Sequence, residues 1–256
     1  MSPMPFSEPL RLRIQLTKRG LARFLSHSEF SRTIMFAARR AGLPLDYAGQ
    51  FRSRMKLSLS PPIPIGVTSE CELVDFTLNG YVSPADARES LNGAFPAGIE
   101  VVRCRLMGAD ERPVGKLIDT ASYLVTLPAN AGTREVWERA VDDFLRSDVV
   151  DFERVQPRRT RVINLRPGVH HLVVAQAEKD ERVTLSMELD DGTRGTVKAW
   201  EIIEVVAGLA GVPRETWERA DVHRSGLFTR RGDRLVSPME LGKRKPAVSR
   251  RGGGRY

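Results

Sequence analysis

The sequence predicts an α+β fold made of two ferredoxin-like domains in tandem, each a split β-α-β arrangement, with a disordered basic C-terminal tail. Two observations carry this prediction. Segments with alternating apolar residues, typical of half-buried strands, occur in both halves, and each half also holds two segments with apolar residues at helical spacing. The predicted boundaries are 1–107 for the first domain, 108–119 for a linker, 120–228 for the second domain and 229–256 for the tail.

In the first domain the elements are expected in the order strand, helix, strand, strand, helix, strand. The first strand is 10–16, where Leu and Ile alternate with Arg and Gln. A helix follows Ser26, because Ser26 and Glu29 form a capping-box pattern, and Gly42 ends it. A second helix begins at Pro84, after the capping residue Ser83. The remaining extended segments are expected at 45–59, 72–78 and 99–106.

The second domain shows a comparable mixture of strands and helices. One helix follows the capping residue Thr133, and another is expected at 198–209, where Ile202, Ile203 and Val206 recur at helical spacing. The last strand, 220–227, reads as an edge strand. The other strands are expected at 122–127, 152–155, 162–165, 172–177 and 183–189.

The net charge of +8 is unevenly distributed along the chain. Residues 11–60 hold eleven Lys and Arg against two acids, and residues 229–256 hold nine against two. The segment 61–150 is acidic, with fourteen acids against eight bases, and 151–228 is nearly balanced. Segregated positive charge is typical of proteins that bind polyanions, because each neutralised phosphate releases counterions. The tail also lacks any apolar period, so it is expected to be disordered.

Composition narrows the class of protein. No run of about 18 apolar residues occurs, which argues against a membrane span. Residues 1–9 lack the basic start and apolar core of a secretory signal. Cys71 and Cys104 are the only cysteines, which is too few for a disulfide framework. These features predict a cytoplasmic protein.

The motifs of catalytic and metal sites are not found. Four histidines and two cysteines, with His170 and His171 adjacent, do not give the ligand spacing of a metal site or an iron–sulfur cluster. Glycine-rich phosphate loops and the Gly-x-Ser-x-Gly nucleophile motif do not occur either. The sequence therefore predicts no catalytic residues, no metal and no cofactor in this chain.

The most basic segment also contains aromatic residues. Tyr47 and Phe51 lie among cations, a pattern suited to base stacking and phosphate neutralisation, and His27 lies at a helix N-terminus, where phosphates bind. A second basic string runs from Arg154 to Arg166. The candidate nucleic-acid-binding residues are Lys18, Arg19, Arg23, Ser26, His27, Arg39, Arg40, Tyr47, Arg52, Arg54, Lys56, Arg158, Arg159, Arg161 and Arg166. Strand alternation is expected to expose Arg52, Arg54 and Lys56 and to bury Phe51.

Several short motifs resemble a radical-SAM-linked protein family. They are Phe24-Leu25-Ser26-His27, 39–44 (Arg-Arg-Ala-Gly-Leu-Pro), Tyr47, Phe51, Pro64-Ile65-Gly66-Val67, Ser69-Glu70, Leu91-Asn92, Pro96-x-Gly98 and Ile163-x-Leu165-Arg166-Pro167. The resemblance covers roughly 10–228 and implies a radical SAM protein as partner. An iron–sulfur cluster and S-adenosylmethionine are then expected on that partner only.

Three functions stay open from the sequence. The first is an RNA-binding accessory, or substrate-presenting partner, of a radical SAM modification enzyme. The second is a self-sufficient RNA-processing enzyme, a nuclease or a modification enzyme, in which His27 would serve as general acid or base. The third is a protein–protein adaptor without RNA binding, for which the acidic segment 61–150 offers a docking surface.

Overall fold

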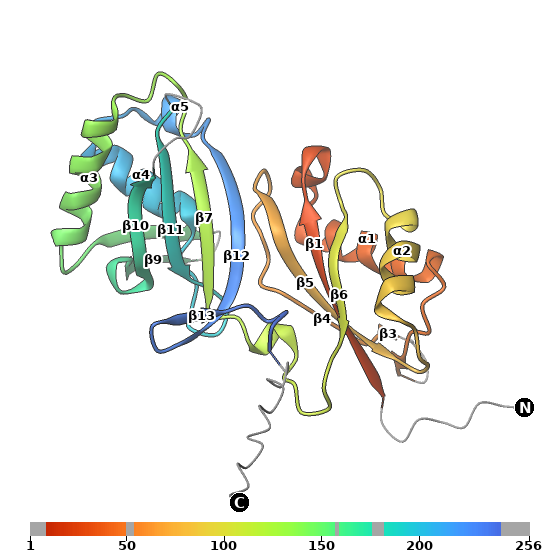
Figure 1. Ribbon diagram of the computed structural model, residues 1–256. Coiled ribbons are helices and arrows are strands. Elements are labelled where there is room, and N and C mark those ends of the chain that lie inside the picture. The colour runs from red at the N-terminus through yellow and green to blue at the C-terminus, as the bar shows by residue number, and fades with distance from the viewer. Residues whose placement is uncertain (1–8, 50–53, 157–158, 176–181, 242–256) are drawn as a thin grey trace, which may run out of the picture.

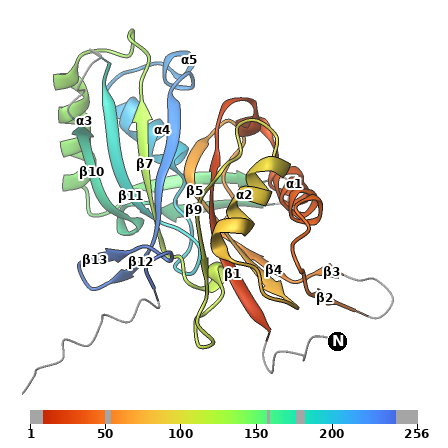
Figure 2. The ribbon, with the colours of Figure 1, turned by 45° about the vertical axis from the view of Figure 1, so that its right-hand side comes forward.

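The computed structural model describes residues 9–49, 54–156, 159–175 and 182–241 (Figure 1). It is an α+β structure in which nine strands form one large mixed sheet. The described residues also form five α-helices, of which α1 and α2 lie at one end of the sheet and α3 and α4 at the other (Figures 1 and 2). Within these ranges no helix is long and apolar enough to cross a membrane.

The first half of the sheet has the strand order β4-β5-β1-β6, and all neighbours are antiparallel. The predicted capping box of α1 is confirmed, since the Ser26 hydroxyl accepts from the Glu29 amide and the Glu29 carboxylate accepts from the Ser26 amide. Pro84 begins α2 as predicted. The elements are β1 (Leu10–Lys18), η1 (Gly20–Phe24), α1 (His27–Arg40), β2 (Tyr47–Ala48), β3 (Arg54–Met55), β4 (Leu57–Leu59), β5 (Thr68–Leu78), α2 (Pro84–Ala94) and β6 (Val101–Leu106).

In the second half the strand order is β10-β11-β7-β12, again with antiparallel neighbours. A separate hairpin of β8 and β9 is inserted between α3 and β10. The elements are η2 (Val114–Lys116), β7 (Thr120–Thr126), α3 (Arg134–Arg146), β8 (Asp151–Gln156), β9 (Arg159–Asn164), η3 (Arg166–Gly168), β10 (Val169–Ala175), β11 (Thr184–Asp190), α4 (Ala199–Leu209), α5 (Arg214–Trp217), β12 (Asp221–Arg231) and β13 (Arg234–Val236).

The two halves are joined through the sheet itself. Strand β12 pairs in parallel with the start of β5, where His223 lies opposite Thr68 and Arg224 opposite Ser69. The end of β5 pairs with β4 on the same side, which is possible because β5 is eleven residues long. Residues 220–227 were predicted to form an edge strand. That prediction was wrong, because β12 has β7 on one side and β5 on the other.

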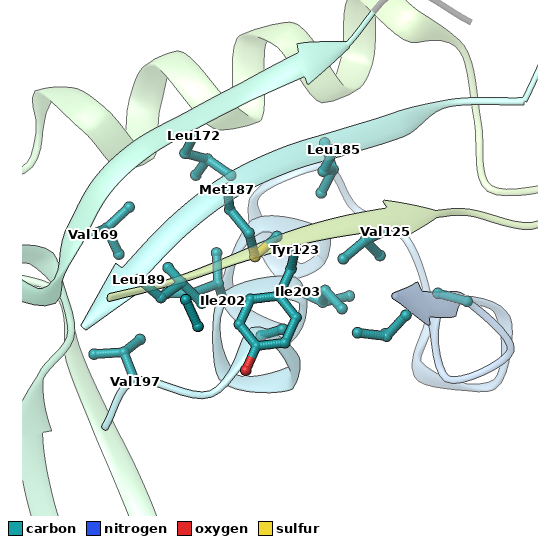
Figure 3. Close-up of a cluster of buried hydrophobic side chains, with 14 of the residues drawn as sticks. Tyr123, Val125, Val169, Leu172, Leu185, Met187, Leu189, Val197, Ile202 and Ile203 are labelled. Atoms are coloured by element: carbon teal, nitrogen blue, oxygen red, sulfur yellow. The ribbon is translucent and has the colours of Figure 1, made fainter. Parts of the chain in front are cut away.

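Each half has its own apolar core, and the second core extends across the junction. In the first, β1 and β5 pack against α1 and α2. In the second, side chains such as Met187, Ile202 and Ile203 gather between the strands and α4, with the Tyr123 oxygen at the edge of the cluster (Figure 3). Leu73 of β5 and Ile118 of the predicted linker also belong to this second core. The junction is therefore packed as a domain interior is.

Part of the predicted disordered tail is ordered. Strand β12 continues to Arg231, β13 pairs with it, and the side chain of Met239 is only 2% exposed. The prediction was wrong for residues 229–241, because a short hairpin and one buried methionine need no apolar period of the kind that longer elements show. Residues 242–256, which carry the rest of the predicted tail, lie outside the described residues.

Candidate nucleic-acid interface

Lys18, predicted to bind phosphate, is buried. Its Nζ atom donates to the Leu25 carbonyl at 2.9 Å and lies 5.6 Å from the centroid of the Phe30 ring. Burial lowers the pKa of this ammonium group, and the Glu72 carboxylate opposes that effect. The residue continues the inward face of β1 after Leu16, because β1 extends two residues beyond the predicted strand 10–16. Lys18 is not part of a nucleic-acid surface.

Neighbouring cations of the same segment are paired with acids. Arg19 forms an ion pair with Glu70 at 2.6 Å, and Arg23 forms one with Asp221 at 3.3 Å. Arg13 is fully buried and bonded to Asp75. The acids lie on β5 and β12, outside the basic segment 11–60. Part of the positive charge counted in the segment 11–60 is therefore neutralised by acids from other parts of the chain.

His223 lies where β12 pairs with β5, and its protonation is linked to the free energy of unfolding. His223 Nδ1 lies 2.8 Å from the Thr68 hydroxyl, and its Nε2 lies 3.5 Å from Glu70. Burial lowers the pKa of His223, although Glu70 works in the opposite direction. The unfolded chain, with a histidine pKa of about 6.5, therefore binds a proton at pH values where the folded protein does not.

We predict that the free energy of unfolding falls as the pH drops from about 6.5 toward the lowered pKa of His223. The variant His223→Gln keeps a polar side chain but cannot titrate, so its stability should depend less on pH in that window. Urea unfolding at a series of pH values between about 8 and 5, for both proteins, measures the difference. Identical pH profiles would contradict the prediction.

The exposed side of α1 carries cations and an aromatic ring. Arg32, Phe36, Arg39 and Arg40 follow one another at helical spacing, opposite the buried Ile34 and its apolar neighbours. Phe36 is 59% exposed, which is unusual for a ring on a helix that has a well-formed apolar face. Sequence reasoning missed Phe36, although its position off the apolar stripe of α1 was the available signal.

The hairpin of β2 and β3 continues this surface. Tyr47 is 38% exposed, and the guanidinium carbon of Arg39 lies 6.0 Å from the centroid of its ring. Arg54 is exposed on β3, opposite Ala48. Both views show α1 and β3 on the outer side of the first half, away from the second half (Figures 1 and 2). We call Arg32, Phe36, Arg39, Arg40, Tyr47 and Arg54 the α1–β2 surface.

The cations of the α1–β2 surface are available to a ligand. Among the described residues none of its four arginines forms an ion pair with a carboxylate, whereas Lys56 nearby is bound to Asp46 at 2.6 Å. The predicted alternation is confirmed where the structure describes it, because Met55 is buried between the exposed Arg54 and Lys56. Phe51 and Arg52 lie outside the described residues. The structure thus brings four of the predicted residues together, Arg39, Arg40, Tyr47 and Arg54.

The N-terminus of α1 adjoins this surface at Arg32, whose Nε atom donates to the Ser28 carbonyl at 3.3 Å. The Ser26 hydroxyl accepts from the Glu29 amide at 3.3 Å and donates to the Glu29 carboxylate at 2.6 Å, so the hydroxyl is fully used by the cap. These bonds lower the pKa of Glu29, whose negative charge works against a phosphate at this helix end. His27 is exposed at the first helical position. A phosphate contact by His27 stays a prediction.

Two of the described arginines of the second basic string, Arg154 and Arg166, are bound within the fold. Arg154 donates to both Glu201 oxygens, at 2.7 and 2.6 Å, and Arg166 donates to main-chain carbonyls. Arg161 is exposed on β9. Arg158 and the side chain of Arg159 lie outside the described residues. In the part of the chain that can be described, no three His, Cys, Asp or Glu side chains are grouped closely enough to hold a metal ion.

Comparisons with known proteins give a family and a set of distant structural similarities. A family model described as "Uncharacterized protein conserved in bacteria (DUF2344)" matches residues 11–199. No curated protein sequence matches the chain.

Among solved structures, the chain resembles a Cbf5–Nop10–Gar1 complex with a TM-score of 0.44 and 12% identity, over 84% of this chain and 48% of the other. An H/ACA ribonucleoprotein bound to a substrate RNA containing 2′-deoxyuridine gives 0.41 and 13%, over 83% and 46%. An archaeal box H/ACA Nop10–Cbf5 complex gives 0.40 and 11%, with the same coverages. The chain spans slightly less than half the length of these chains, and at such scores the similarity assigns no function to it.

Proposed function

We propose that this chain, which belongs to the bacterial family described above, binds single-stranded RNA through the α1–β2 surface. In this role it is an accessory to a modification enzyme. The observation that carries the proposal is the placement of Phe36 and Tyr47 among four arginines, none of which forms an ion pair with a carboxylate in the described residues. Exposed rings stack with unpaired bases, and the flanking guanidinium groups neutralise the backbone.

The radical SAM protein implied by the resemblance is the proposed modification enzyme. In this arrangement the partner carries the iron–sulfur cluster and S-adenosylmethionine, and the chain described here presents the RNA. Surface cations on the described residues support the role of this chain in holding the RNA. We further infer that each half is a ferredoxin-like unit, because both halves have the connectivity strand, helix, strand, strand, helix, strand with equivalent strand orders.

The proposal predicts that the double variant Arg39→Gln/Arg40→Gln binds RNA more weakly and with less salt dependence. The log–log slope of affinity against salt should flatten by about 0.7 for each lost phosphate contact. Fluorescence anisotropy with an unstructured single-stranded RNA oligonucleotide, at several salt concentrations, measures both quantities. Phe36→Ala should lower the affinity by about 1–3 kcal/mol per stacked base and leave the slope unchanged.

A matched control is available on another helix. Arg139 and Arg146 are exposed on α3, and replacing both with Gln removes the same charge from a face that also holds Asp142 and Asp143. This control should bind RNA as the wild type does. Equal loss of binding in both double variants would mean that net charge alone attracts the RNA. Undiminished binding by Arg39→Gln/Arg40→Gln and by Phe36→Ala would rule out the α1–β2 surface, and a DNA oligonucleotide of the same sequence tests the preference for RNA.

A second candidate function, the protein–protein adaptor, is favoured by one specific observation. Phe24 and Ile65 are exposed apolar side chains on two segments that are joined by two hydrogen bonds between Arg23 and Gly66. Pull-down of the radical SAM partner with Phe24→Ser/Ile65→Ser, in the presence of RNase, distinguishes this function. Loss of capture would support docking at Phe24 and Ile65, whereas capture abolished by RNase alone would support an RNA bridge.

A further inference from the structure

A cavity of about 880 Å³ lies at the junction of the two halves, apart from the α1–β2 surface. The first half contributes the loop from Pro62 to Val67, between β4 and β5. The second half contributes β8 of the inserted hairpin and the beginning of α4. Its volume is in the range of sites for small molecules and cofactors. Because both halves build its walls, the cavity exists only in the assembled fold.

The buried floor of the cavity is polar. Asp191 and Tyr123 line it, and both side chains are almost fully buried. One Asp191 oxygen, Oδ1, accepts from the Gly192 amide at 2.9 Å and from the Thr196 hydroxyl at 3.2 Å. The other, Oδ2, lies 3.5 Å from Nη1 of Arg224, a buried nitrogen that has no hydrogen-bond partner within the described residues. The floor therefore retains hydrogen-bonding capacity that the protein itself does not use.

The walls are largely apolar, and the guanidinium group of Arg154 among them is already bound. Phe152, Trp200 and Pro62 supply the apolar surface, and Trp200 packs against Trp217 with ring centroids 6.4 Å apart. The guanidinium group of Arg154 is held by Glu201 and by the Thr196 carbonyl. The lining carries four acids against the three cations Arg154, Lys198 and Arg214, and Arg154 and Arg214 are each paired with a glutamate, so the charge of the lining does not favour an anionic ligand. A ligand that donates hydrogen bonds meets acceptors instead.

We propose that this cavity binds a planar nitrogen heterocycle with ring N–H or amino donors, that is, a nucleobase or its nucleoside. The ring would stack between the apolar walls, and its donors would bind the Asp191 carboxylate at the floor. The ligand could be a free nucleoside or an unpaired base of an RNA strand, and both present the same edge to Asp191. The proposal is independent of RNA binding by the α1–β2 surface.

The test uses the two exposed valines of the hairpin as a matched pair. Val155 is 75% exposed and lines the cavity, whereas Val162, on the adjacent strand, is 67% exposed and does not line it. Both positions tolerate a larger side chain because they are open to solvent. Isothermal titration calorimetry of the full chain is performed with adenosine, guanosine, cytidine and uridine. At least one nucleoside should bind to the wild type and to Val162→Trp, and its affinity should fall about tenfold or more in Val155→Trp.

A second variant tests the chemistry of the floor. Asp191→Asn replaces one carboxylate oxygen by an amide, so a ligand that donates to Asp191 should bind about tenfold or more weakly. Thermal melting of each variant tests whether it is folded. If Asp191→Asn does not fold, the comparison of Val155→Trp with Val162→Trp decides the proposal. Competition by an unstructured RNA oligonucleotide distinguishes a free nucleoside from an unpaired base of an RNA strand as the ligand. The competition is measured in the variant Arg39→Gln/Arg40→Gln. If the RNA displaces the nucleoside there, the cavity binds a base of the strand. Absence of binding by all four nucleosides and by RNA at the cavity, or binding that Val155→Trp leaves unchanged, would overturn the proposal.

Discussion

Replacing Arg224 with Met should lower the free energy of unfolding by about 3–5 kcal/mol, as expected when one partner of a buried ion pair is removed. Arg224 is fully buried at the junction, where its guanidinium group is bonded to Glu72 of β5 and to the Pro61 carbonyl. Asp191 lies 3.5 Å from the same group. The substitution keeps a long apolar side chain but leaves two buried carboxylates without their cation.

Two further variants separate the charge from the packing. Arg224→Lys keeps a positive charge but lacks the planar fork that bonds Glu72, so its loss of stability should be intermediate. The double variant Arg224→Met/Glu72→Gln removes both charges of the pair and should be more stable than Arg224→Met alone. Urea unfolding followed by circular dichroism measures all three. If Arg224→Met costs less than about 1 kcal/mol, the buried pair does not hold the junction together.

Truncation after Val236 should also destabilise the protein strongly, by about 3 kcal/mol or more. The removed segment contains the Pro238 carbonyl, which accepts from Arg13 at 3.0 Å and from Arg105 at 2.7 Å. It also contains the buried side chain of Met239. Both arginines would lose an acceptor inside the protein, and the apolar contact of the methionine would be replaced by water.

Truncation after Leu241 is the matched control, because it preserves all these contacts and removes only residues beyond them. Its melting temperature should equal that of the full chain. The difference between the two truncations, measured by thermal unfolding, isolates the contribution of residues 237–241. Equal stability of both truncated chains would show that Pro238 and Met239 contribute little to the fold.

Local features of the sequence were sufficient to predict most elements. The Ser26–Glu29 box and Pro84 mark the starts of α1 and α2, because capping depends on residues within one helical turn. The pairing of β12 with β5 could not be predicted in this way. It joins residues such as Arg224 and Glu72, which are 152 positions apart, and neither strand carries a local signal for its neighbour.

The candidate site shows the same division between local and distant information. Arg39, Arg40 and Tyr47 were predicted from the composition of a short segment, and the structure places them together. Lys18 was misassigned because the acids and the apolar residues that surround it come from other parts of the chain. Phe36 belongs to no motif, and its exposure follows only from its position off the apolar stripe of α1. Charge counted along a sequence includes cations such as Arg13 that the folded protein neutralises.

The pairing of β5 with β12 has a consequence for synthesis on the ribosome. Glu72 leaves the exit tunnel 152 residues before Arg224, the cation that it binds in the finished sheet. At about 5–20 residues per second, this interval lasts roughly 8–30 s. During that time the first half carries an open strand edge and an acidic group without its guanidinium partner. The nascent chain is then most exposed to misassociation, and a chaperone that shields β5 would act in this interval.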